Sequence, residues 1–332
     1  MKRYTIILGF LLVACSCDQP RTNFDQGIVP LEVVNFTEIN SRYDDYNSAG
    51  PMMFSEDHFT LVFSSKRNRL GADFDLVSYH CLADLNNETG HFGFYTDPQG
   101  WPLLDSINTT ANEYGPYIAI ELTDYWLNGG AEGEEKTFYY ASDETGDLDI
   151  LFWNYKLENG LEIMDSGRVN GLNSPYDEGY LCHYNGASSM GETVYFTSDR
   201  DGDFDIFMAT GDSAKITTSV NFDIIKLDIL SGPFDDKCPY IVNDLLVFTS
   251  DREGGYGGFD LWYSSWNGSA WSAPVNFGEQ INSEYNEYRP IIVPSSEGPL
   301  LNDILIFSSD RPGGAGGYDL YYTGMKRPKD YF

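Results

Sequence analysis

Five carboxylates recur at one position of a repeated acidic motif, and they are the residues of this chain most able to do chemistry. They are Asp45, Glu113, Glu178, Asp236 and Glu287. Carboxylates gathered at one mouth of a channel would concentrate cations there and could bind a basic, extended peptide or a glycan. The same acids could instead cap their own loops by accepting hydrogen bonds from backbone N–H groups. Both interpretations remain open, and we predict an acidic binding ring.

Aromatic side chains beside the acids would border such a ring. They are Tyr46, Tyr114, Tyr180 and Tyr288, and each offers an apolar face with a polar tip. Paired acids could also hydrolyse glycosides, a reaction that uses two carboxyl groups with different pKa values. Equivalent acids repel one another and do not divide into acid and base. We therefore expect no catalytic residue and no enzyme, with a glycoside hydrolase as the alternative function.

Metal and nucleophile chemistry has little support in the sequence. The weak candidates for a calcium loop are Asp199, Asp201, Asp203 and Asp205. They lack the terminal Glu of an EF-hand, so we predict no metal and no cofactor, with Ca²⁺ as the alternative. The histidines, which are not at metal-ligand spacing, are His58, His80, His91 and His183. His183 follows Cys182 without an evident third partner, and neither a G-x-S-x-G motif nor a P-loop occurs.

A hairpin motif follows each acidic motif and predicts how the acids are positioned. It consists of an apolar strand, Ser-Asp-Arg, a glycine-rich turn, and an aromatic residue and Asp that open a second strand, as in 306–322. The second Asp occurs at positions 75, 149, 205, 260 and 319, so the intervals are 74, 56, 55 and 59 residues. Because Ser-Asp-Arg recurs in the units, we interpret it as hydrogen bonds and an ion pair that fix the turn, and not as a ligand clamp.

Each unit supplies four short antiparallel strands, which predicts an all-β fold, a five-bladed β-propeller. The last unit lacks its fourth strand, because only residues 324–332 follow its hairpin. A matching strand is present at the other end, where residues 30–41 repeat the pattern of residues 274–283. We therefore predict that the N-terminal strand completes blade five, closes the ring and removes the exposed sheet edges.

Length and charge restrict the class of protein. The chain has 332 residues, of which 42% are hydrophobic and 15% aromatic, so it can bury a core and is neither wholly disordered nor a disulfide-stapled miniprotein. Its 51 acidic and 20 basic residues give a formal charge of −31. This excess repels phosphate groups, so nucleic acid is excluded as a partner and anionic membrane surfaces are disfavoured.

The first residues predict export. Lys2 and Arg3 precede an apolar run at 6–13, which is far shorter than the roughly 20 residues of a membrane span. The ending, residues 12–15, resembles a bacterial lipobox, which makes Cys15 the predicted lipidation site. We expect a signal peptide at 1–14, a lipid-anchored tether at 15–27, one propeller domain at 28–325 and a tail at 326–332. A plain signal peptide that is cleaved elsewhere is the alternative.

The cysteines of the propeller carry no motif. Cys81, Cys182 and Cys238 are odd in number and lack C-x-x-C spacing, which is not typical of a zinc or thioredoxin-like site. We expect buried free thiols, and a bridge between Cys182 and Cys238 is the alternative in an exported protein.

The last two repeats carry a family resemblance. Residues 307–321, preceded by 281–290, closely resemble the WD-repeat-like propeller repeats of the periplasmic protein TolB, in the variety found in envelope proteins of Bacteroidota. The resemblance covers residues 28–323, although blade one has Lys66 where Asp is expected and blade two has Glu144 where Arg is expected. It implies a non-catalytic lipoprotein of the cell envelope, at the outer membrane, facing the periplasm or the cell surface. The implied partner is an envelope protein or a basic, extended peptide, with a glycan as alternative, and only the lipid anchor contacts the membrane.

Overall fold

The computed structural model describes residues 27–49, 52–55, 58–86, 88–89, 92–119, 135–157, 160–184, 192–213, 215–294, 300 and 302–325. The predicted signal peptide, Cys15, nearly all of the tether, His91 and the C-terminal tail lie outside the described residues. Within them, no helix is both long enough and apolar enough to cross a membrane.

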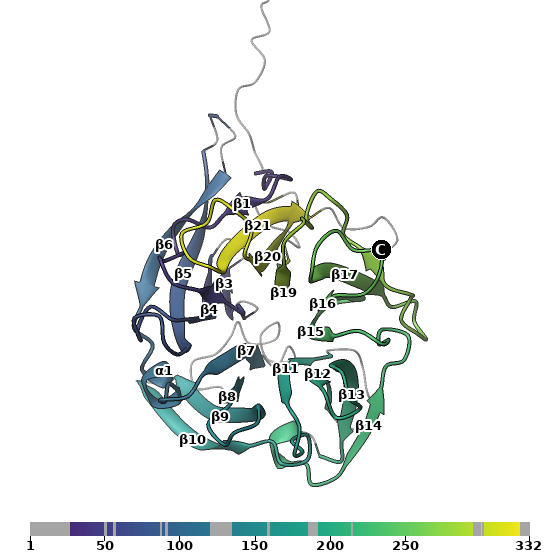
Figure 1. The fold of residues 1–332 in the computed structure, drawn as a ribbon. Coiled ribbons are helices and arrows are strands. Elements are labelled where there is room, and N and C mark those ends of the chain that lie inside the picture. Colours follow the sequence, from purple (N-terminus) through teal and green to yellow (C-terminus); the bar gives the residue numbers. More distant parts are fainter. Residues whose placement is uncertain are drawn as a thin grey trace, which may run out of the picture.

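Five antiparallel sheets surround a central axis, and each sheet is one blade of a propeller (Figure 1). The predicted all-β fold with five blades is confirmed. Blade one contains β2 (Asp45–Tyr46) and β3 (Met52–Ser55) at the axis, then β4 (His58–Ser65), β5 (Asp75–Leu85) and β6 (Phe92–Gln99). Blade two contains β7 (Glu113–Ala119), β8 (Glu135–Ser142), β9 (Asp149–Leu157) and β10 (Leu161–Arg168). Blade three contains β11 (Glu178–His183), β12 (Thr193–Ser198), β13 (Asp205–Gly211) and β14 (Phe222–Lys226).

The last two blades complete the ring. Blade four contains β15 (Asp236–Val242), β16 (Leu245–Ser250), β17 (Asp260–Ser265) and β18 (Val275–Asn276). Blade five contains β19 (Glu287–Val293), β20 (Asp303–Ser309), β21 (Asp319–Met325) and β1 (Val34–Asn35). Helical structure in the described residues is confined to the connections, as α1 (Pro102–Ile107) and the 3-10 turn η1 (Ile216–Thr218).

The ring is closed by a strand from the N-terminal region. β1 pairs antiparallel with β21, with Val34 opposite Tyr322, so blade five has the strand order β1-β21-β20-β19. The backbone N–H of Phe36 donates to Leu320 O at 2.9 Å, which continues the pairing beyond the strand. The predicted closure is confirmed, and β1 and β21 lie side by side in Figure 1.

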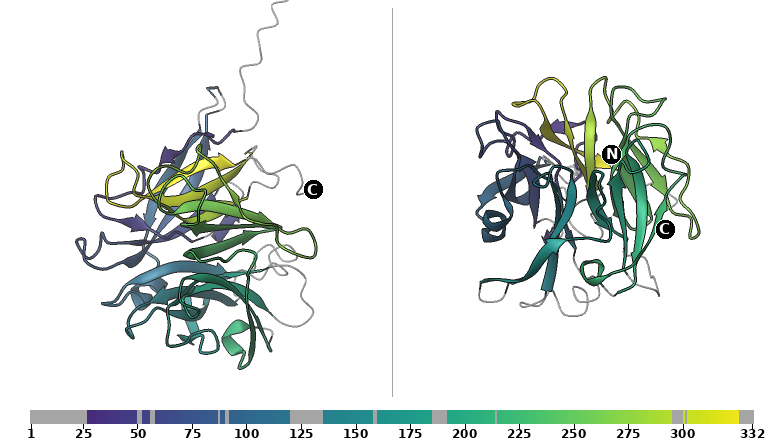
Figure 2. Two further views of the ribbon diagram at one scale, coloured as in Figure 1. Left: turned by 45° about the vertical axis from the view of Figure 1, so that its right-hand side comes forward. Right: turned by 60° about the horizontal axis from the view of Figure 1, so that its bottom comes forward.

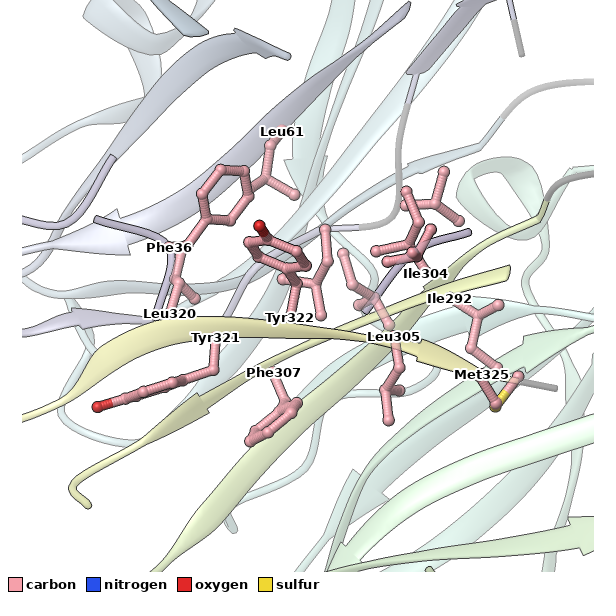
Figure 3. Close-up of a cluster of buried hydrophobic side chains, with 14 of the residues drawn as sticks. Phe36, Leu61, Ile292, Ile304, Leu305, Phe307, Leu320, Tyr321, Tyr322 and Met325 are labelled. Atoms are coloured by element: carbon pink, nitrogen blue, oxygen red, sulfur yellow. The ribbon is translucent and has the colours of Figure 1, made fainter. Parts of the chain in front are cut away.

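Apolar side chains from distant parts of the chain pack at this junction (Figure 3). Phe36, Leu61 and Phe307 are fully buried there, and the ring centroids of Phe36 and Tyr322 are 5.2 Å apart. Burying a side chain of this size contributes roughly 1.5–3 kcal/mol. Hydrophobic burial therefore stabilises the contact between blades one and five beyond the two residue pairs of β1.

Blade one differs from the others in length. Its β5–β6 hairpin extends past the neighbouring blades (Figure 2), since β5 has 11 residues and β6 has 8. This hairpin, together with α1, accounts for part of the long first interval of the repeat.

Candidate functional site

The five acids of the repeated motif each occupy the first residue of an innermost strand. They are Asp45 in β2, Glu113 in β7, Glu178 in β11, Asp236 in β15 and Glu287 in β19. All five residues are 0% exposed, so they do not line an open mouth. Their carboxylates are bonded inside the blades. A ligand-binding role for the ring stays a prediction.

In four blades an arginine and a serine hold the acid, and Glu287 shows the arrangement. Its Oε1 accepts hydrogen bonds from Ser309 Oγ at 3.0 Å and from the Arg311 guanidinium at 2.8 Å. The N–H of Ser283 donates to its Oε2 at 2.8 Å. The equivalent ion pairs are Arg67 with Asp45, Arg200 with Glu178, and Arg252 with Asp236. The acids thus cap their loops, and Ser-Asp-Arg fixes the turn as the repeat indicated.

Blade two breaks this pattern. Glu144 is exposed and stands where the other blades have arginine. Glu113 Oε1 accepts hydrogen bonds from the Thr109 hydroxyl at 2.6 Å and N–H at 3.2 Å, but its buried Oε2 has no hydrogen-bond partner. Burial raises the pKa of Glu113 to about 7, although Thr109 and Arg69 act to lower it. Glu113 is therefore a ring acid that exchanges its proton near neutral pH.

A second carboxylate lies beside Glu113. Asp75 is the first residue of β5, is 4% exposed, and pairs with Arg69, whose Nε lies 3.1 Å from Asp75 Oδ1. The negative charge of Asp75 contributes to the raised pKa of Glu113. Arg69 also donates to Thr109 O, so these residues form one connected group between blades one and two. The two carboxyl groups therefore differ, because Glu113 has a raised pKa and Asp75 is paired with a cation.

The residues nearest the axis lie two positions beyond the acids. They are Asn47, Gly115, Tyr180, Cys238 and Arg289, with φ angles of 53°, 51°, 55°, 59° and 50°. In blades two to five the pairing register shifts at this residue, as in a β-bulge. A Cβ on Gly115 would lie 2.6 Å from the Tyr180 ring, so glycine is needed for that ring to fit. All five residues are buried.

Arg289 of blade five contacts three other blades at this axis. It is 0% exposed, and its guanidinium donates to Ser48 O at 3.3 Å, Pro116 O at 3.3 Å and Pro239 O at 3.4 Å. Its Cζ also lies 5.5 Å from the centroid of the Tyr180 ring. These long hydrogen bonds link blades one, two and four to blade five through backbone carbonyls.

The structure brings three of the four predicted tyrosines to equivalent positions. Tyr46 and Tyr288 stack with ring centroids 5.1 Å apart, and Tyr114 follows Glu113 in the same way. Tyr180 lies one residue later, at the axial position, because Gly179 follows Glu178 in blade three. Burial raises the pKa of Tyr46 and Tyr288 well above the usual tyrosine value, so both hydroxyls are neutral.

The weak calcium candidates serve the turn of blade three. The N–H of Asp177 donates to Asp199 Oδ1 at 2.8 Å, and Asp205 pairs with Lys226, which lies 4.0 Å from Asp201. Across the part of the chain that the structure describes, no group of three or more His, Cys, Asp or Glu side chains could hold a metal ion.

His183 has a partner that the spacing did not reveal. Its Nδ1 lies 2.7 Å from Glu192 Oε1, and its ring stacks on Tyr117 at 5.4 Å. Although burial opposes it, the hydrogen bond from His183 lowers the pKa of Glu192. The two residues flank the connection from β11 to β12, so only the folded hairpin brings them together.

The cysteines of the propeller are free. Cys81, Cys182 and Cys238 are buried and unbridged, as expected in preference to a disulfide. Burial raises the pKa of each thiol to about 12, so none is a reactive thiolate at neutral pH.

Several solved structures that superpose on this chain are glycoside hydrolases. An endo-arabinase from Bacteroides thetaiotaomicron superposes with a TM-score of 0.56 at 9% identity, covering 91% of this chain and 99% of that one. For an exo-β-1,3-galactanase from Clostridium thermocellum the TM-score is 0.51 at 12% identity, and the superposition covers 90% of this chain and 64% of that one. For an α-L-arabinofuranosidase from Podospora anserina it is 0.50 at 12% identity, covering 92% and 98%. No protein-family model and no curated protein matches the sequence.

These neighbours correct the expectation of a non-catalytic binding scaffold. They are glycoside hydrolases and not TolB-like proteins, so they give no support to a TolB-like scaffold. At 9–12% identity the likeness itself shows the fold alone. The five acids are not equivalent, since Glu113 differs from the arginine-paired acids in its partner and has a pKa of about 7. The propeller part of the family resemblance is confirmed, and its TolB part has no support.

Restoring the missing arginine should stabilise the protein. Glu144→Arg would place a guanidinium beside Glu113, as Arg311 lies beside Glu287 in blade five. Hydrogen bonds to charged groups contribute roughly 1.5–3 kcal/mol, so we expect the free energy of unfolding in urea at pH 8 to rise by about that amount. Glu253→Arg is the matched control, because Glu253 is exposed and Arg252 already fills the site in blade four. An equal rise in both variants would attribute the gain to net charge alone.

Proposed function

We propose that the chain is a five-bladed-propeller glycoside hydrolase in which Glu113 is the general acid. The observation that carries this proposal is the pKa of Glu113, which burial raises to about 7 in a blade that lacks the neutralising arginine. General acids work best when their pKa lies near the working pH. The glycoside hydrolases that share the fold are consistent with this choice of reaction class.

Asp75 is the second carboxylate of the proposal. Asp75 forms an ion pair with Arg69, and its charge acts on Glu113. In hydrolysis, Glu113 gives its proton to the glycosidic oxygen as the bond to the anomeric carbon breaks, and a carboxylate either activates water or attacks that carbon. We assign the second role to Asp75, because its charge contributes to the raised pKa of Glu113.

Access to Glu113 requires a local movement of the chain. Glu113 is fully buried, whereas Thr110 in the preceding loop is exposed. A sugar oxygen would reach the buried Oε2 only after such a movement. Phe74 and Tyr114, whose ring centroids are 5.3 Å apart, flank this position and offer apolar faces to a sugar ring. The formal charge of −31 favours neutral or basic glycans over uronic acids.

Substitution of the proposed acid should remove activity without unfolding the protein. With arabinan and galactan oligosaccharides as first substrates, Glu113→Gln should lower kcat at pH 6 by about 10²–10⁴-fold, because general acid catalysis contributes that factor. Asp75→Asn should be similarly impaired, and Asp84→Asn, at an exposed position of β5, is the control. The thermal unfolding midpoint of each variant checks its fold. Absence of turnover by the wild type on a broad glycan panel would reject the hydrolase.

The pH dependence gives an independent test. Glu113 donates a proton only while it is protonated, so kcat/KM should fall as the pH rises through about 7. In Glu144→Arg the added positive charge favours the carboxylate and lowers the pKa of Glu113. The falling limb should therefore move to lower pH, and kcat/KM at pH 7 should decrease, in a variant that is more stable than the wild type. A limb that stays in place would assign the pH dependence to another group.

We also propose that the protein is exported and anchored to the cell envelope by a lipid on Cys15. The basic residues, short apolar run and lipobox-like ending support this proposal. Labelling of cells with a fatty-acid analogue should mark the wild-type protein and not the Cys15→Ser variant, in which Cys17 remains as an internal control. Labelling of Cys15→Ser at the wild-type level would contradict the assignment.

A further inference from the structure

Four blades show how this protein binds a guanidinium group. The arginines Arg67, Arg200, Arg252 and Arg311 each donate from Nε to the serine two residues earlier, at 2.8, 3.0, 3.0 and 3.2 Å. Each Nη2 donates both to the ring acid and to the backbone carbonyl six residues before that acid, as Arg311 does to Glu287 at 2.8 Å and to Ile281 O at 2.7 Å. Each guanidinium also lies over a phenylalanine ring, at 5.2, 5.3, 5.0 and 5.3 Å.

Blade two retains the acceptors of this arrangement without the arginine. Ser142 lies opposite Glu113 in the strand register, as serine and acid do in the other blades. Ile107 lies six residues before Glu113, and Tyr140 takes the place of the phenylalanine two residues before the serine. The charge of Glu113 contributes to the raised pKa of Tyr140, which places the ring near the carboxylate. Glu144, at the arginine position, is exposed.

Glu113 keeps an unsatisfied acceptor where the other blades have an arginine in contact with the acid. Glu113 Oε2 is buried and has no hydrogen-bond partner, and the residue is 0% exposed. Leaving a buried acceptor unpaired is unfavourable, and more so when the group is charged. A donor that reaches Oε2 would recover this free energy on binding.

We propose that blade two binds the guanidinium group of a ligand at the position that arginine fills in the other four blades. The ligand would donate to Glu113 Oε2, Ser142 Oγ and the Ile107 carbonyl, with its plane over Tyr140. The template arginine side chains are 18%, 19%, 14% and 16% exposed, so this position adjoins solvent in the folded blade.

The chemistry of the acceptors selects the class of ligand. A guanidinium presents five N–H donors in a flat fork that matches a carboxylate, a hydroxyl and a carbonyl in one plane, whereas an alkylammonium is a compact, strongly hydrated charge. The negative charge of the protein favours the approach of such a cation. Alkylguanidines are therefore the expected ligands.

This inference depends on the arginine geometry and not on the proposed hydrolase. If the protein hydrolyses glycosides through Glu113, a bound guanidinium would hold that carboxyl group ionised and so inhibit. Binding can be measured without substrate, and failure of one proposal leaves the other open to its own test.

Calorimetric titration of the protein with methylguanidinium tests the proposal. We expect saturable binding at pH 8, and about 100-fold weaker binding at pH 5, because the ligand must there displace the proton of a carboxyl group with a pKa of about 7. Tetramethylammonium, which has the same charge and no N–H donor, should not bind. Glu144→Arg fills the position from within the chain and should abolish binding, while Glu253→Arg should bind as the wild type does.

Two variants distinguish binding at this position from binding elsewhere on the protein. Ser142→Ala removes one acceptor without adding a charge, so its affinity should fall while the circular dichroism spectrum stays that of the wild type. Binding that is equal in the wild type and Glu144→Arg, or equal for methylguanidinium and tetramethylammonium, would overturn the proposal. Absence of saturable binding by the wild type at pH 8 would overturn it as well.

Discussion

A buried carboxylate at the start of each innermost strand is the constraint on which the blades depend. A buried charge is costly unless it is paired and hydrogen-bonded. Glu287 illustrates how the fold meets this cost, because Arg311, Ser309 and the preceding loop all bond to it. Its backbone N–H also donates to Phe259 O in the previous blade, at 2.7 Å. One residue therefore fixes the turn of its own blade and the spacing to the previous blade.

Blade two meets the same constraint by keeping a proton. Without an arginine, the Glu113 carboxyl group is neutral up to a pH of about 7, so no unpaired charge is buried at lower pH. The cost appears at higher pH, because an acid with a raised pKa makes the folded state less stable as the pH rises from its ordinary value towards the shifted one. The departure of blade two from the repeat thus leaves a buried carboxyl group whose charged form is disfavoured and whose pKa lies near neutral pH.

The repeat made the fold predictable, whereas the contacts of the site residues depend on local geometry that the sequence does not show. The matching patterns at 30–41 and 274–283 were enough to predict closure, since a strand lacking at one end of the chain was present at the other. The axial position of Tyr180 could not be predicted, because it depends on a backbone with φ near 55° two residues beyond each acid. Glu192 was missed beside His183, since only the hairpin joins them. The sequence shows Glu144 where the other repeats have arginine. Only the structure shows that those four arginines pair with the ring acids, so that Glu113 lacks such a partner.

The pairing of β1 with β21 also sets an order on folding during synthesis. Val34 and Tyr322 are partners, yet 322 − 34 = 288 residues separate them, so β1 leaves the ribosome long before β21 exists. Blades one to four are built from consecutive segments and can form as the chain emerges. Blade five waits for both of its ends, and loop closure over such a distance is slow. Until then the outer edge of β21 is unpaired, which makes the nearly complete propeller the form most prone to pair with another chain.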